Sequence, residues 1–299
     1  MTAVPTPHEG KAGAAGKEEQ FVAREIDASA RQRSFARRKP LAVVGLLILG
    51  VYLVVAAIGP FLVSDPLLTN PQDALLPPSA EHWFGTDKFG RDVFARSVHS
   101  ARLDLAVGVA IAAVAMVIGS IIGVVGGYFG GWVDEVVMRL TDVVLAFPGF
   151  VLALVLVAVL GNSIPNVMVA VAVAYIPYFI RLTRAEVLTQ REMEYVDGAR
   201  LAGNRRWRVA FRHVLPNSLR PSFVQATLVA GWSILTVAGL AFLGVGIRPP
   251  TPEWGVMVAE GAPDIITGQW WTALFPGGLI VLAVMAFHFI GDEFGGEPL

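Results

Sequence analysis

Long stretches without a charged residue dominate the hydrophobic pattern of this chain. About 20 apolar residues suffice to cross a bilayer, and five uncharged runs reach that length: Leu41–Val63, Leu105–Val133, Val143–Ile180, Ser222–Ile247 and Ile265–Gly291. The third run, of 38 residues, is too long for one span, and the turn-forming segment Gly161–Asn166 divides it into a tight hairpin of two helices. We expect the second span over about Leu105–Gly127. The pattern predicts an all-α polytopic membrane protein with six transmembrane helices.

The positions of Lys and Arg predict how these helices are oriented. If the N-terminus lies inside, the inner segments hold 18 of these residues and the outer loops hold 5. Cytoplasmic loops are the basic ones in membrane proteins. Both termini and the polar segment 184–220 are therefore predicted to be cytoplasmic.

Segment 184–220 is the one long polar and basic interruption between the apolar runs. It predicts two short helices broken at Gly203-Asn204, because glycine adopts the left-handed conformation that ends a helix and asparagine caps the next one. Beyond the break, apolar residues recur at helical spacing and arginines fill the positions between them, as in an amphipathic helix closed by Pro216. The apolar positions are Trp207, Phe211, Val214 and Leu215, and the arginines are Arg205, Arg206, Arg208 and Arg212. A helix–turn–helix of this kind between two spans is the form expected of a docking element.

Composition narrows the possible functions. The 299 residues are 55% hydrophobic and 16% charged, with a mean hydropathy of +0.60, whereas about 25% charged is typical of soluble domains. The net charge of −1 gives no reason to expect nucleic-acid binding. Cysteine is absent and the five His are scattered, so neither disulfides nor a metal site are predicted. The chain has no GxxxxGK[ST] loop, so any ATP would have to be bound by another chain.

The docking segment resembles a known cytoplasmic motif of ABC importer membrane subunits. That motif reads Glu-Ala-Ala, three residues, Gly, nine residues, then Ile-x-Leu-Pro. The same register here gives Asp197-Gly198-Ala199, then Gly203, then His213–Pro216. The spacing matches throughout, and Asp197, Gly198 and His213 depart from the general consensus.

Further motifs make the resemblance more specific. The chain is similar to dipeptide and oligopeptide permeases at Arg212–Asn217, in the outer segment Gly85–Asp92, and in the later loop with Pro249–Gly255 and Glu260-Gly261. Over about residues 40–292 it resembles the second membrane subunit of these importers, the DppC/OppC type. The tail Glu293–Leu299 departs from the family pattern, as does Val237, where many relatives have an acid.

The resemblance implies a type I (MetI-like) ABC permease fold and a non-catalytic role in the prokaryotic cytoplasmic membrane. The implied partners are a second homologous permease, two ABC ATPase subunits or one fused ATPase that binds ATP and Mg, an extracytoplasmic substrate-binding protein and the lipid bilayer. The expected divisions are a tail (1–39), a first helix with an outer loop (40–100), a five-helix core (101–292) that includes the coupling segment 184–220, and a short tail (293–299).

The resemblance also assigns candidate site residues. Those expected to couple to the ATPase are Glu194, Tyr195, Asp197, Gly198, Ala199, Arg200, Gly203, Asn204, Leu215 and Pro216. Candidate contacts to the binding protein are Trp83, Lys88, Arg91, Pro250 and Trp254. Two prolines in the spans, Pro148 and Pro177, are candidate gating positions, and we expect Asp142 to pair with Arg139.

Several alternatives stay open at this point. The same machinery would also serve nickel, opines or another small solute, and the sequence favours di- or oligopeptides only through the resemblance. An ion-coupled secondary transporter would need ionisable residues inside the spans, and the uncharged runs argue against it. A membrane scaffold without transport is the third class.

Overall fold

The structure, a computed structural model, describes residues 40–295; the predicted tail 1–39 and residues 296–299 lie outside the described part. Between these limits the chain is helical apart from its loops. The main helices are α3 (Pro40–Ile58), α4 (Val93–Phe129), α5 (Gly131–Leu145), α6 (Gly149–Leu160), α7 (Ile164–Gln190), α8 (Glu194–Leu201), α9 (Arg206–Val209), α10 (Leu215–Ser218), α11 (Arg220–Phe242), α12 (Trp254–Gly261) and α13 (Trp271–Gly295).

Five of the described helices are long and apolar enough to cross a membrane: α3, α4, α7, α11 and α13. Helices α5 and α6 meet at 88° across a short break and together make a sixth candidate, a bent one. The break falls where Pro148 precedes α6, because proline disfavours the helical conformation of the residue before it and removes a backbone donor. The predicted all-helical membrane fold is therefore confirmed with five candidate spans, and the bent pair is either a broken sixth span or a re-entrant loop. Helix α6 has only 12 residues, so the part of the third uncharged run before Gly161 does not form a straight span of its own.

Helix α4 is longer than predicted. It begins at Val93 rather than Leu105, so twelve residues assigned to the outer loop extend the span to 37 residues. The Asp92 side chain caps the helix by accepting a hydrogen bond from the Ala95 amide at 2.8 Å. The charged residues Arg96 and Asp104 broke the apolar run in sequence, yet both are buried within the fold.

The hairpin between α6 and α7 forms where the turn signal predicted it. Gly161 ends α6 with a positive φ angle, +94°. The Ser163 hydroxyl oxygen accepts a hydrogen bond from the Asn166 backbone amide at the start of α7. The Asn166 side chain donates back to the Leu160 and Gly161 carbonyls, at 2.7 and 3.0 Å. Local chemistry alone fixes this turn, which explains why the sequence located it.

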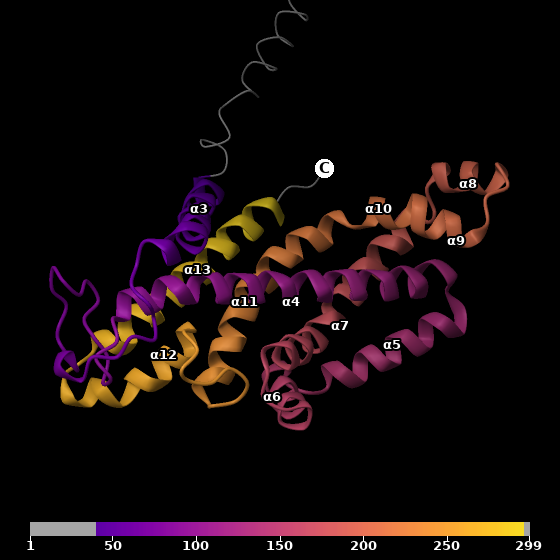
Figure 1. The fold of residues 1–299 in the computed structure, drawn as a ribbon. Coiled ribbons are helices and arrows are strands. Elements are labelled where there is room, and N and C mark those ends of the chain that lie inside the picture. Colours follow the sequence, from indigo (N-terminus) through magenta and orange to yellow (C-terminus); the bar gives the residue numbers. More distant parts are fainter. Residues whose placement is uncertain (1–39, 296–299) are drawn as a thin grey trace, which may run out of the picture.

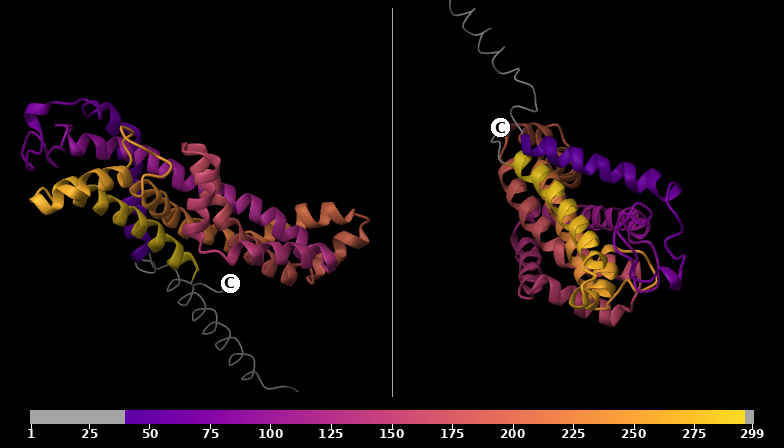
Figure 2. Two further views of the ribbon diagram at one scale, coloured as in Figure 1. Left: turned by 90° about the horizontal axis from the view of Figure 1, so that it is seen from below. Right: turned by 90° about the vertical axis from the view of Figure 1, so that its left-hand side faces the viewer.

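The long helix α4 runs along the molecule from one end to the other (Figure 1). The short helices α8 and α9 lie beyond one end of α4, and α12 with the loop that precedes α4 lies at the other, as the view from below also shows (Figure 2). The two polar regions of the chain are therefore at opposite ends of the bundle.

Helices α4 and α7 pack most closely, through three glycines of α4. A Cβ atom at Gly119 or Gly123 would lie 2.8 Å from the carbonyl oxygen of Ile176 or Ile180, and one at Gly127 would lie 3.1 Å from that of Arg184. The spacing of four residues places all three on one face, where small residues let two backbones approach. Buried hydroxyls then link three helices, since Thr183 of α7 is 3.0 Å from both Ser120 of α4 and Ser222 of α11.

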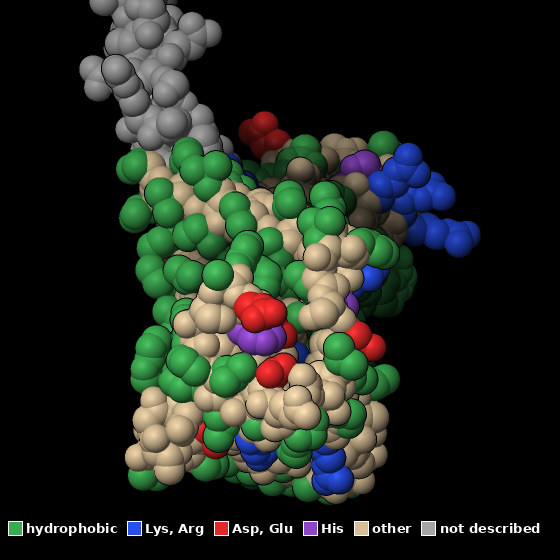
Figure 3. All heavy atoms as spheres, turned by 60° about the vertical axis from the view of Figure 1, so that its left-hand side comes forward, with side chains coloured by type: hydrophobic (Ala, Val, Ile, Leu, Met, Phe, Trp, Pro, Cys, Tyr) green, Lys and Arg blue, Asp and Glu red, His purple; other side chains and the backbone are tan. Residues whose placement is uncertain are grey.

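Large apolar side chains remain exposed on the outside of the spans. Leu47 and Val51 of α3 are 66% and 63% exposed, as expected of residues that face lipid. Figure 3 shows hydrophobic side chains spread over much of one face, with Lys and Arg side chains gathered at its margins.

Candidate functional site

The polar segment between α7 and α11 forms a small domain of short helices. Helix α8 is followed by a turn, then by α9, a π-helical stretch at Ala210–Val214, and α10. Helix α10 leads almost directly into α11, so Pro216 lies inside a helical stretch instead of closing it. The prediction that Pro216 ends the helix is wrong, because proline in the first turn of α10 needs no backbone donor.

A buried cluster holds these helices against the ends of α4 and α7. Val196 is the only buried residue of α8, and it packs with Val124 and Tyr128 of α4 and Val187 of α7. From the second half of the segment, Val209, Ala210 and Val214 join the same cluster. Because both halves share one core, the segment is expected to move with these helix ends and not as a free loop.

Polar contacts reinforce this attachment. Arg191 donates to the Gly127 carbonyl at 2.9 Å, which ties the start of the segment to the end of α4. Arg200 pairs with Asp197 at 2.9 Å and lies 5.7 Å from the centre of the Tyr128 ring. The Arg206 guanidinium carbon lies 5.4 Å from the centre of the Phe129 ring. The centre of the Trp207 ring lies 4.4 Å from the centre of the same phenyl ring.

The break in the segment occurs at Gly203, as predicted, but Asn204 has a different role. Gly203 has φ +79°, the left-handed conformation that favours glycine. The Asn204 side chain donates to the Ala199 carbonyl at 2.9 Å, so it caps the end of α8. The N-cap position of α9 is Arg205, which makes no side-chain cap. The predicted N-cap role of Asn204 is therefore wrong.

The outer surface of this segment is open. A Cβ atom at Gly198 or Gly203 would contact nothing within 4 Å, and Leu201 between them is 89% exposed. The remaining candidate coupling residues on this surface are exposed or half-buried: Glu194, Tyr195, Asp197, Ala199, Arg200, Asn204, Leu215 and Pro216. The arginines at 205, 206, 208 and 212 are exposed as well. We call this the coupling surface, a cationic face with one protruding leucine.

Ion pairs connect the neighbouring helix α5 to α7. Arg184 donates to both carboxylate oxygens of Asp134, and Arg181 reaches Asp142 at 2.6 Å. The predicted pairing of Asp142 with Arg139 is wrong, since Arg139 lies 3.8 Å from Glu135 instead. Nothing in the sequence distinguishes these partners, because α5 and α7 are brought together only by the fold.

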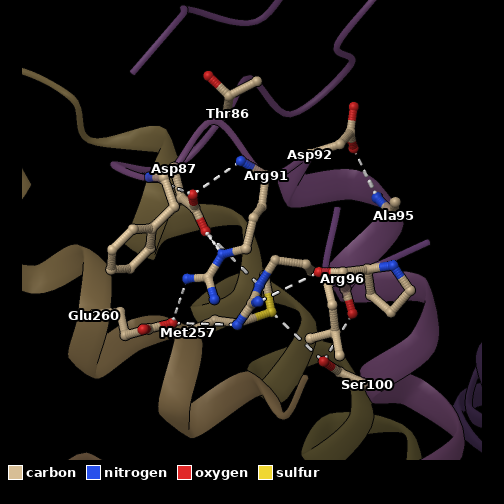
Figure 4. A network of polar contacts seen from close by, with 12 residues as sticks. Thr86, Asp87, Arg91, Asp92, Ala95, Arg96, Ser100, Met257 and Glu260 are labelled. Atoms are coloured by element: carbon tan, nitrogen blue, oxygen red, sulfur yellow. Dashed lines mark hydrogen bonds and ion pairs between the residues drawn. The ribbon is translucent and has the colours of Figure 1, made fainter. Parts of the chain in front are cut away.

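At the opposite end, a buried network joins the loop before α4 to α12 (Figure 4). Arg91 pairs with Asp87 at 2.6 Å and with Glu260 of α12 at 2.9 Å. Arg96 of α4 reaches the same Glu260 oxygen at 3.2 Å. Both arginines point inward between the start of α4 and α12 (Figure 4). The two guanidinium groups are paired with the carboxylates of Asp87 and Glu260, because a charge removed from water needs a partner of opposite sign.

Trp254 and Glu253 are buried in the same region. The Trp254 indole donates to the Ser97 carbonyl at 3.0 Å, and its backbone amide donates to Asp104 at 3.1 Å. The Glu253 carboxylate caps α12 by accepting a hydrogen bond from the Val256 backbone amide at 2.6 Å. Burial of Glu253 raises the pKa of its carboxyl group.

These contacts bear on which residues of the outer loops can contact the binding protein. Arg91 and Trp254 are 4% and 0% exposed, so neither presents a surface to a docking protein, and both instead hold α12 against α4. Trp83, Lys88 and Pro250 are exposed, as a contact residue must be.

Of the candidate gating prolines, Pro148 stands at the bend between α5 and α6 and Pro177 is buried inside α7. Within residues 40–295 no group of three His, Asp or Glu side chains is placed to hold a metal ion.

Comparison with known proteins places the chain in a family. Residues 115–292 match the model of the binding-protein-dependent transport system inner membrane component. The chain belongs to this family. Residues 34–78 also match the N-terminal transmembrane domain of oligopeptide transport permease C. The protein is therefore a multi-span membrane permease subunit of an ABC importer, as the resemblance in its motifs implied.

Similar curated proteins are named as peptide permeases. The dipeptide transport system permease protein of Alkalihalophilus pseudofirmus is 45% identical over 86% of this chain and 84% of its own. A probable D,D-dipeptide transport system permease protein of Escherichia coli is 41% identical over 85% of each chain. The glutathione transport system permease protein of Pectobacterium atrosepticum is 43% identical over 72% of this chain and 71% of its own.

Proposed function

We propose that this chain imports di- or oligopeptides as one of two homologous membrane subunits of an ATP-driven importer. The names of the three relatives described above support peptides as the cargo, and two of these names refer to dipeptides. The family supports the general machinery, in which a binding protein delivers substrate to the membrane component. Hydrolysis of ATP then belongs to one or two partner ATPase chains, which bind the ATP and Mg.

The coupling surface is the observation that carries this proposal. A docking element must be exposed on one side and fixed to the transport helices on the other. The segment meets both requirements, because Leu201 protrudes at 89% exposure while Val196 is fully buried against α4 and α7. Movement of an ATPase bound at the coupling surface would reach α7 and α11 directly, since they flank the segment.

The other untested assignments follow from this arrangement. The coupling surface faces the cytoplasm, together with both termini. The loop before α4 and the loop before α12 face outward and receive the binding protein through Trp83, Lys88 and Pro250. The bend at Pro148 and the proline of α7, Pro177, are the positions where the core helices change angle as access alternates. The core with this role is residues 101–292, and α3 is a peripheral span.

The experiment is peptide uptake by the complete importer, reconstituted in proteoliposomes with its partner permease, ATPases and binding protein. The test variant is Gly203→Ala, because an alanine at φ +79° is strained by about 1–2 kcal/mol. We expect the turn of the coupling surface to rearrange, and uptake to fall by about fivefold or more while the amount of protein in the membrane stays unchanged.

Gly268→Ala is the matched control. Gly268 has φ +95° and open space around it, but it lies in the loop before α13, at the opposite end of the protein. Its substitution carries the same backbone strain and should leave uptake near wild type. Equal uptake by the two variants would reject the coupling role of Gly203, and failure of the wild-type complex to take up any peptide would reject the cargo.

A further inference from the structure

A groove with an unusual lining lies between α7 and α11. It has a volume of about 260 Å³ and is lined by Tyr175 and Tyr178 from α7 and by Gln225, Val229 and Trp232 from α11. Tyr175 is held in place, since its hydroxyl lies 3.1 Å from that of Thr236. Both helices are candidate membrane spans, so this groove belongs to the membrane-embedded part of the protein.

Three polar groups at this groove have no hydrogen-bond partner among residues 40–295: the Tyr178 hydroxyl, the Gln225 carboxamide and the Trp232 indole N–H. Tyr178 and Trp232 are each 48% exposed. An unsatisfied polar group costs several kcal/mol in hydrocarbon. A surface that faces lipid would therefore not collect three of them, so the groove is covered by water, a polar ligand or polar groups of the partner permease.

The lining residues carry no formal charge. Tyrosine, glutamine and tryptophan provide donors, acceptors and aromatic faces, but no group that would form an ion pair with a particular side chain. Such a surface suits a ligand of repeated amide groups with varied side chains. Aromatic faces add contact area that tolerates many partners.

The groove is also placed where the coupling segment can change it. Its two walls are the helices that enter and leave the coupling surface, so any tilt transmitted from there alters its width. Pro177 lies between Tyr175 and Tyr178, and a proline inside a helix removes one backbone hydrogen bond and allows a bend at that point. Aromatic side chains on both sides of that bend would shift together with it.

We propose that this groove is a transient contact site for the main chain of the transported peptide. Tyr178, Gln225 and Trp232 bind amide groups of the passing chain, and the lack of charge lets peptides of different sequence use the same site. This inference rests on the proposed function, because it assigns a residue-level path to the same cargo.

The test is site-specific photocrosslinking in the reconstituted importer. p-Benzoylphenylalanine replaces Tyr178 or Trp232, and a radiolabelled dipeptide is supplied with the binding protein and ATP. Leu235 is the matched control, because it lies on α11 beside Trp232, is 43% exposed and does not line the groove. We expect ATP-dependent labelling of this chain from both groove positions and none from Leu235.

A second measurement separates contact from packing. Tyr178→Phe and Gln225→Leu keep the size of the side chains and remove the polar groups. We expect each to lower the maximal uptake rate by about fivefold, the typical effect of one lost hydrogen bond. Assembly with the partner permease and the basal ATPase rate should stay unchanged. Leu235→Ala should transport as wild type does.

Two results would overturn the inference while wild-type peptide uptake proceeds. One is crosslinking from the groove positions to the partner permease or to lipid without peptide labelling, which would make the groove a packing surface. The other is full uptake by both polar-deletion variants. Absence of peptide uptake by the wild-type importer would instead overturn the proposed function, and this inference with it.

Discussion

Glu253 illustrates how burial changes the chemistry of a single residue. It is 1% exposed at the start of α12, where its carboxylate accepts the Val256 amide, and burial raises its pKa above the ordinary value for glutamate. A raised pKa means that the folded protein holds the proton more tightly than the unfolded chain does. The contribution of Glu253 to folding stability is therefore fully present below about pH 4.3, the ordinary pKa of glutamate, and is lost as the pH rises through the folded pKa.

Glu253→Gln should reduce this pH dependence. The amide oxygen can still accept the Val256 hydrogen bond, but it never ionises. We expect the melting temperature of the purified variant in detergent to fall less than that of wild type between about pH 4 and pH 8. Thermal unfolding scans at several pH values measure it. Glu81→Gln, at an exposed position of the loop before α4, is the control and should follow wild type. Parallel pH curves for Glu253→Gln and wild type would contradict this role for Glu253.

Arg91 and Trp254 show what residue type alone leaves open. The family resemblance predicts that both residues, which belong to outer segments, contact the binding protein. The fold instead brings Glu260 to Arg91 across 169 positions of sequence, and it buries the side chains of Arg91 and Trp254. Trp83 and Lys88 were identified on the same reasoning and are exposed.

At the scale of elements, the contact between α4 and α7 depends on small residues. The backbones of α4 and α7 approach each other closely at Gly119, Gly123 and Gly127. Of the glycines in α11, only some lie against the neighbouring helix α13. Gly231 packs against α13, whereas Gly239 of the same helix faces a phenylalanine ring of α6. A glycine in a span thus brings two backbones close only where the backbone of a partner helix faces it.

Gly123→Ala should weaken this contact. Its Cβ atom would lie 2.8 Å from the Ile180 carbonyl oxygen and 3.0 Å from the Thr183 Cβ, so the helices would have to move apart. We expect a loss of about 1–3 kcal/mol in stability, as for other overpacked cores. The measurement is the thermal unfolding of the purified protein.

Gly50→Ala provides the comparison, because Gly50 is a helical glycine of α3 with nothing within 4 Å. That variant should be as stable as wild type or slightly more so, since alanine favours helix. If both variants unfold at the same temperature, the packing of α4 on α7 does not depend on Gly123.

For the whole molecule, the orientation in the membrane is a prediction that concerns its two polar ends. The coupling surface and the loop before α4 lie at opposite ends of the bundle (Figure 1). The excess of Lys and Arg in the segments around the coupling surface favours the cytoplasm for that end.

Cysteine labelling tests this orientation directly, because the natural chain contains no cysteine. Two exposed alanines serve as matched positions, Ala80 in the loop before α4 and Ala202 at the end of α8. A membrane-impermeant maleimide should label Ala80→Cys in intact spheroplasts and Ala202→Cys only after permeabilisation. The reverse pattern would invert the topology and place the coupling surface outside.

The sequence by itself determined the features that depend on local composition and turn chemistry. Uncharged runs located five spans but not the first three turns of α4 or the charged helix α5. Gly161–Asn166 located the hairpin and Gly203 located the break in the docking segment, because backbone conformation depends on neighbouring residues. Tertiary structure alone decided the partners of the charges and the face of each helix that is buried. Arg184 with Asp134, Arg91 with Glu260, and the groove of Tyr178 and Trp232 all join residues of separate helices. Their pairing depends on how whole helices pack, which no local pattern specifies.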